Sequence, residues 1–123
     1  MNNEDKLGWA FYMRTSPREK ETLESQRMAL VKFANKNHFP VDKEFIDEKV
    51  SANKSNIRPQ FSKMLEQIEI GEVNKIICLY KEKLSENYRD SYTLENLLWH
   101  EKLKEIRYVT VKKRKTANRE NGS

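Results

Sequence analysis

The stretch Trp9-Ala10-Phe11-Tyr12-Met13-Arg14-Thr15-Ser16 decides the fold, because an apolar run ends abruptly in polar residues that are followed by Pro17. This pattern predicts a strand that places Arg14 and Ser16 at its carboxyl end. Ligands of open α/β sheets bind beyond the carboxyl ends of the strands, so an anion is expected to reach both side chains there. A second interpretation stays open at this point, in which Ser16 caps a helix that begins at Pro17.

Length and composition indicate one domain with its own core, since the chain has 123 residues. No run approaches about 20 apolar residues, and the first eight residues contain no apolar signal segment, so we expect a cytoplasmic protein without a membrane span. The single cysteine, Cys78, lies inside an apolar run, which predicts a buried, reduced thiol. A disulfide within the chain and a cysteine metal site are therefore excluded.

The net charge of +5 is concentrated in the last residues. Residues 112–123 hold five bases and one acid and carry +4, whereas residues 1–111 carry only +1. We therefore expect a domain over residues 1–111 and a basic, disordered tail over residues 112–123. The tail is a candidate DNA-binding element through phosphate contacts, although a merely solvated end fits the same composition; its clustered bases are Lys112, Lys113, Arg114 and Lys115.

Helical and strand patterns alternate after the first strand. Thr22 is an N-cap candidate, and the residues after it predict a helix over 22–37, with an inner face of Leu23, Leu30, Val31 and Ala34. A strand over 41–46 and a polar loop over 47–58 follow. Pro59 then begins a helix that ends near Gly71, a candidate for the C′ position.

The third part of the chain repeats the alternation. Residues 73–80 are nearly all apolar, as expected for a central parallel strand covered on both faces. A charged loop over 81–87, a helix over 88–104 and a strand over 106–111 follow, and the helix is expected to bury Tyr92, Leu94, Leu97, Leu98 and Trp99. Right-handed crossovers between such elements predict a three-layer α/β/α fold with a mainly parallel sheet of about four strands.

Three loops leave this predicted sheet at one edge, and each carries side chains suited to phosphate chemistry. Serine can form a covalent phosphoryl intermediate, and the planar fork of arginine donates two aligned hydrogen bonds to phosphate oxygens. The candidates are Arg14 and Ser16 in the first loop, Asp47, Ser51 and Arg58 in the second, and Glu82, Lys83 and Glu86 in the third.

The order of these motifs over residues 9–111 resembles the N-terminal catalytic domain of the resolvase/invertase family of serine recombinases. The resemblance rests on Tyr12-x-Arg14-x-Ser16, Gln26, Asp47 with Ser51, Arg58-Pro59 before a Phe61/Met64-Leu65 helix, Gly71, and Lys83-Leu84-Ser85. It implies a phosphoryl transfer that uses neither metal nor cofactor, in which Ser16 attacks a DNA phosphate and forms a 5′-phosphoserine intermediate before strands are exchanged in a tetramer and resealed.

The resemblance also implies roles for individual residues. Catalytic roles fall to Ser16, Arg14, Arg58, Lys83 and Glu82, and supporting roles fall to Tyr12, Gln26, Asp47 and Ser51. DNA is the implied partner, and a homodimer or tetramer is implied for an assembled recombinase, whose family adds a long dimer helix and usually a DNA-binding domain.

One segment departs from the family pattern. The family has Asp-Arg-Leu-x-Arg after the central strand, whereas this chain has Glu82-Lys83-Leu84-Ser85-Glu86. Lys83 lacks the fork of arginine and Glu86 reverses a charge, and the loss of one preorganised donor costs about 10²–10³ in rate. We therefore expect reduced activity.

Two alternatives stay open. One is a catalytically inactive relic that binds DNA or a recombinase subunit. The other is an unrelated flavodoxin-like module, against which the chain offers no phosphate-binding glycine loop, since its only glycines are Gly8, Gly71 and Gly122.

Overall fold

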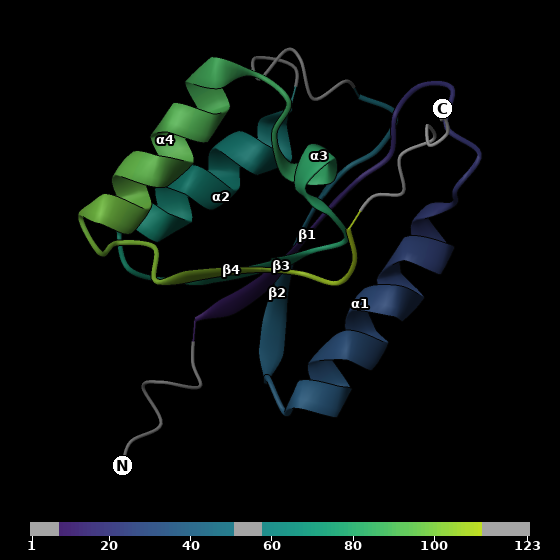
Figure 1. The fold of residues 1–123 in the computed structure, drawn as a ribbon, viewed down its shortest axis with the longest axis horizontal. Coiled ribbons are helices and arrows are strands. Elements are labelled where there is room, and N and C mark those ends of the chain that lie inside the picture. Colours follow the sequence, from purple (N-terminus) through teal and green to yellow (C-terminus); the bar gives the residue numbers. More distant parts are fainter. Residues whose placement is uncertain (1–7, 51–57, 112–123) are drawn as a thin grey trace, which may run out of the picture.

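A four-stranded parallel sheet with helices on both faces forms the domain (Figure 1). The computed structural model describes residues 8–50 and 58–111. The strand order is β2-β1-β3-β4 and each neighbouring pair is parallel, so the predicted three-layer α/β/α fold is confirmed. The strands are β1 (Trp9–Arg14), β2 (Val41–Asp47), β3 (Lys75–Cys78) and β4 (Glu105–Tyr108).

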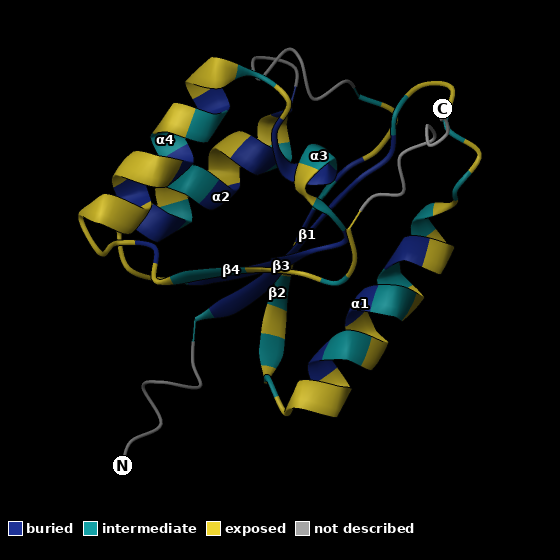
Figure 2. Ribbon diagram, in the orientation of Figure 1, coloured by how far each residue is buried: buried dark blue, intermediate teal, exposed yellow. Residues whose placement is uncertain are grey.

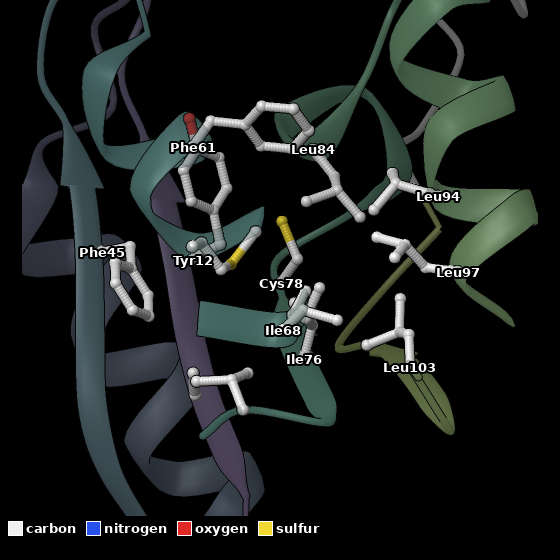
Figure 3. Close-up of a cluster of buried hydrophobic side chains, with 13 residues drawn as sticks. Tyr12, Phe45, Phe61, Ile68, Ile76, Cys78, Leu84, Leu94, Leu97 and Leu103 are labelled. Carbon is white, nitrogen blue, oxygen red and sulfur yellow. The ribbon is translucent and has the colours of Figure 1, made fainter. Parts of the chain in front are cut away.

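The side chains of β1 alternate between two cores, as the two-residue period of a strand requires. Tyr12 joins the core under α2 (Pro59–Glu69) and α4 (Tyr88–Trp99), which Figure 3 shows in close-up. Phe11 and Met13 join the core on the other face, under α1 (Leu23–Asn37). Every residue of β1 and β3 is therefore buried, and both strands are dark blue in Figure 2.

Local signals fix the ends of the first two helices where the sequence predicted them. The Thr22 hydroxyl accepts a hydrogen bond of 3.0 Å from the Ser25 N–H and caps α1. The helix ends at Asn37, and the C-cap residue His38 is left-handed with a φ of 60°. Gly71 follows the C-cap of α2 with a φ of 85°, a conformation that glycine adopts without strain.

The third part of the chain differs from its prediction. Residues 81–84, predicted as loop, form the one-turn helix α3 (Lys81–Leu84). The helix α4 ends at Trp99 rather than near residue 104, because the chain turns at Glu101 with a φ of 61°. The last strand is likewise shorter than predicted and ends at Tyr108.

The predictions of which side chains α4 and α1 bury are partly wrong. Leu94 and Leu97 are buried, but the exposed fractions of Tyr92, Leu98 and Trp99 are 65%, 36% and 82%. The buried stripe of α4 is narrow, and Leu103 beyond the helix supplies the remaining contact with the core. Val31 of α1 is also exposed, whereas Leu30 and Ala34 are buried as predicted.

Within the described ranges, no helix combines the length and the apolarity that crossing a membrane requires.

Cys78 is a free thiol buried in the central strand β3, as predicted. Burial raises its pKa from 9.0 to about 12. We expect a thiol reagent to modify the native chain at least 10²-fold more slowly than the denatured chain, because a buried, protonated thiol is inert. Stability should also fall as the pH rises above about 9, since the thiolate forms first in the unfolded chain. Reaction rates with and without denaturant measure the first effect, and equally fast labelling would contradict the burial.

Candidate active site

The carboxyl ends of the parallel strands bring the predicted loops to one edge of the sheet. Arg14 and Asp47 are register partners at the ends of β1 and β2, and the loop after β3 emerges beside them. A pocket of about 220 Å³ lies at this edge, lined by Arg14, Ser16, Glu19, Tyr80, Glu82, Lys83 and Glu86. The structure therefore brings together five of the predicted residues, from the first and third loops.

Ser16 follows β1 in a turn, and its side chain is half-buried. The Glu19 N–H donates to the Ser16 carbonyl at 3.2 Å, and the next helix begins only at Leu23 under its Thr22 cap. The interpretation of Ser16 as a helix cap is therefore wrong. Its hydroxyl oxygen instead accepts a hydrogen bond of 2.8 Å from Nη1 of Arg14. The Ser16 hydroxyl therefore lines the pocket while the cationic Arg14 guanidinium donates to its oxygen.

The Arg14 guanidinium connects the first loop with the other two. Besides Ser16, Nη1 donates to the Val50 carbonyl at 2.8 Å, and Nε and Nη2 donate to the carbonyls of Lys83 and Glu82 at 3.1 and 3.0 Å. The backbone of Arg14 is held in turn by the Gln26 amide, through bonds of 3.2 and 3.1 Å. The Gln26 side chain thus fixes the backbone at the end of β1.

Lys83 is almost fully buried, with an exposed fraction of 1%, and carboxylates surround its ammonium group. It donates to Oε2 of Glu19, and Oε1 of Glu21 lies 3.9 Å away. The other oxygen of Glu19 accepts the Ser16 N–H at 2.8 Å. Burial alone would raise the pKa of Glu19, but the hydrogen bonds from Lys83 and the Ser16 backbone outweigh it and the pKa is lowered. Burial and the neighbouring Glu19 raise the pKa of Glu21.

Arg58 is fully buried and is not among the residues that line the pocket. Its Nη1 pairs with Oδ2 of Asp90 at 3.1 Å, its Nε donates to the Tyr12 hydroxyl at 3.2 Å, and its Nη2 donates to the Leu84 carbonyl. The guanidinium carbon stacks over the Phe61 ring at 3.9 Å from the ring centre. In the described structure the Arg58 side chain thus joins α2 to α3 and α4.

Tyr12 and Asp47 extend this buried network to the start of α2. The Tyr12 hydroxyl donates to Oδ2 of Asp47 at 2.8 Å, and burial raises its pKa, so the proton stays on the tyrosine. The Asp47 carboxylate also accepts the N–H groups of Gln60 and Phe61 at 3.0 and 2.9 Å. A carboxylate at these donors caps the helix and complements its dipole.

The two networks meet at α3. The Glu82 and Lys83 carbonyls accept from Arg14, and the Leu84 carbonyl accepts from Arg58. Carbonyls at the end of a short helix have no partner within it, so the two guanidinium groups satisfy them. Both arginines therefore hold the backbone of α3, two residues of which line the pocket.

Three functional neighbours were missed at the sequence level. Glu19 and Glu21 lie in a polar segment without periodicity, which gives no signal of a contact with Lys83. Asp90 is recognisable in the sequence only as a partner of the N-cap Asn87, which it also contacts in the structure. Ser51 and the basic cluster of residues 112–115 lie outside the described residues. In the part of the chain that the structure describes, no three His, Cys, Asp or Glu side chains gather to hold a metal ion.

Comparisons with known proteins show the family of the chain. The family described as "Resolvase, N terminal domain" matches residues 9–122. No curated protein sequence matches the chain.

Solved structures give the same fold. The C-terminal catalytic domain of ISC1926 TnpA, an IS607-like serine recombinase, is 24% identical with a TM-score of 0.70, over 83% of this chain and 69% of that one. The N-terminal catalytic domain of TP901-1 integrase is 23% identical with a TM-score of 0.68, over 77% and 72%. A resolvase family site-specific recombinase from Streptococcus pneumoniae is 23% identical with a TM-score of 0.65, over 80% and 69%.

The family match covers most of the chain. The chain therefore belongs to the resolvase family and contains the N-terminal catalytic domain of a serine recombinase.

Proposed function

We propose that this domain cleaves and rejoins DNA strands in site-specific recombination, with Ser16 as the nucleophile. The observation that carries the proposal is the hydrogen bond of 2.8 Å from Nη1 of Arg14 to the Ser16 hydroxyl, at the wall of a pocket. Negative charge develops on the attacking oxygen and on the phosphate, and fixed cationic donors stabilise such charge in a site shielded from water. Arg14 is 3% exposed and meets this requirement.

The proposed step is a transesterification. A bond forms between Oγ of Ser16 and the phosphorus, and the bond from phosphorus to the 3′-oxygen breaks. The serine loses its proton to the surroundings, and the leaving 3′-oxygen takes one up. The product is a 5′-phosphoserine link that keeps the phosphodiester energy, so the reverse step can reseal the strand. Lys83 and Glu82 of α3 are the proposed companions of Arg14 at the phosphate.

The buried Arg58, Tyr12 and Asp47 act in this proposal as positioning residues. Arg58 bonds the α3 backbone and Asp47 holds the start of α2, so both fix the elements that surround the pocket. DNA is the proposed partner, and strand exchange requires at least two copies of the domain. The basic cluster of residues 112–115 is proposed to add contacts with the DNA backbone.

A second function is favoured by the charge of the pocket. Its lining holds Arg14 and Lys83 against Glu19, Glu82 and Glu86, a formal excess of one negative charge. A pocket of that charge repels a phosphate, which suits a domain that binds DNA or a recombinase subunit without cleaving.

The two functions differ in covalent adduct formation. The chain would be fused to the dimer helix and DNA-binding domain of a related recombinase, and its protein–DNA adduct would be measured on a nicked site, with Ser16→Ala as the blank. We expect adduct in the parent and none in the Ser16→Ala variant, which should stay folded because the Ser16 side chain is half-buried and its described side-chain contact is one hydrogen bond from Arg14.

Glu86→Arg is expected to raise the yield of adduct about tenfold, because it removes a repulsive charge and adds a donor beside the phosphate. Glu66→Arg, the same change at an exposed position of α2, is the matched control and should have no effect. Absence of adduct from both parent and Glu86→Arg, in assembled complexes on DNA, would favour the non-catalytic function.

A further inference from the structure

The loop between β1 and α1 carries an acidic side chain that the family motif does not include. Glu19 lies in this loop, and both of its carboxylate oxygens are engaged at the pocket. Oε1 accepts the Ser16 N–H at 2.8 Å, and Oε2 accepts from the Lys83 ammonium. A carboxylate thus bridges the backbone of the nucleophile and the buried cation, two groups that would otherwise face a bound anion.

The buried ammonium group of Lys83 needs an anion beside it. The Lys83 side chain is 1% exposed, and the described neighbours of its ammonium group include Glu19, Glu21 and the Tyr80 ring, whose centre is 5.6 Å away. A buried ammonium without an anionic partner is costly, so an anion is required beside it. A carboxylate or a phosphodiester can meet that requirement, but the Ser16 N–H is a single donor already bonded to Glu19, so the two anions compete for it.

The loop itself is weakly attached. Pro17, Arg18 and Lys20 are exposed, and residues 17–21 include no member of either hydrophobic core. Besides the two bonds of the Glu19 carboxylate, the described attachments of this loop are the turn bond from the Glu19 N–H to the Ser16 carbonyl and the Lys83 contact of Glu21. Movement of the Glu19 side chain away from the pocket therefore breaks few contacts.

We propose that Glu19 is an internal competitor of the substrate, whose carboxylate fills an anion subsite formed by the Ser16 N–H and Lys83 until a DNA phosphate displaces it. The inference rests on the proposed function and deepens it. The excess negative charge of the pocket then belongs only to the state without bound DNA. When Glu19 withdraws, two cations face two carboxylates in the pocket.

The test measures anion binding at Ser16 without any cleavage. The full chain, labelled with ¹⁵N, is titrated with inorganic phosphate at constant ionic strength, and the Ser16 amide resonance reports on the subsite alone. Glu19→Gln is expected to tighten phosphate binding about tenfold, because it removes a like charge next to the anion. Glu24→Gln, the same change in the first turn of α1, is the matched control and should leave the affinity within about twofold.

A second variant tests whether Glu21 takes the place of Glu19 beside Lys83. Glu19→Gln combined with Glu21→Gln should bind phosphate at least as tightly as the single variant. Unchanged or weaker binding in both variants would overturn the proposal and make Glu19 an organiser of Lys83. A gain in the double variant alone would overturn the assignment to Glu19.

The adduct assay separates this inference from the proposed function. Tighter phosphate binding in Glu19→Gln without any Ser16–DNA adduct would support the role of Glu19 as a competitor and contradict the proposed DNA cleavage. Adduct formation with unchanged phosphate affinity in Glu19→Gln would support the proposed DNA cleavage and contradict the role of Glu19 as a competitor.

Discussion

Replacing Arg58 with methionine is expected to lower the free energy of unfolding by about 3–5 kcal/mol, a large share of the roughly 5–15 kcal/mol that holds a domain of this size together. The reason is the carboxylate that remains. Asp90 is 3% exposed and pairs with Arg58 at 3.1 Å, so the variant buries a charge without its cationic partner. The Tyr12 hydroxyl and the Leu84 carbonyl each lose a donor as well.

Denaturant unfolding followed by circular dichroism measures this loss. Arg27→Met is the matched control, because Arg27 forms an ion pair of 2.7 Å with Glu44 whose side chains are 40% and 36% exposed. Exposed pairs contribute about 0–1 kcal/mol, so the control should unfold almost like the parent. Adding Asp90→Asn to Arg58→Met should recover part of the loss. Equal stability of Arg58→Met and Arg27→Met would contradict the buried ion pair.

Arg14→Lys is expected to reduce the rate of Ser16–DNA adduct formation by about 10²–10³, the usual cost of one preorganised donor. Lysine keeps the charge, but its single ammonium group cannot reach the Ser16 hydroxyl and the carbonyls of Val50, Glu82 and Lys83 together. The hydroxyl then loses its fixed donor, and α3 loses its attachment to β1.

The adduct rate in the fused recombinase, measured at temperatures where the variant is folded, isolates this effect from stability. Arg18→Lys is the control, because Arg18 is exposed two residues after Ser16 and the same substitution there should leave the rate unchanged. An Arg14→Lys variant that forms adduct at the parental rate would show that the fork of Arg14 serves the scaffold alone.

Much of the fold could be predicted from the sequence because its signals are local. An apolar run marks β1, Thr22 is the N-cap of α1, and Gly71 lies two residues after the last residue of α2. The inner face of α4 was predicted too broadly, because a pattern rich in aromatic residues does not show which of them the core has room for. Tyr92 and Trp99 belong to that pattern, but both are exposed.

The sequence predicted which loops meet at the candidate site, but not which side chains pair there. Parallel strands bring their carboxyl ends together, so the meeting of Arg14 and Ser16 with Lys83 follows from topology. The pairing of Arg58 with Asp90 and that of Lys83 with Glu19 join residues far apart in the sequence. Polar residues leave no periodic trace of their partners, so such pairs emerge only in three dimensions.

The attachment of α3 through its backbone has a consequence for how such a domain can diverge. Both arginines hold carbonyl groups, which every amino acid possesses, so the identities of Glu82 and Lys83 are free of that duty. Mutations of the half-buried Glu82 can change the chemistry of the pocket while this backbone attachment persists. A lineage can thus pass through weakly active or silent forms without unfolding, and a later substitution can restore activity on an intact frame.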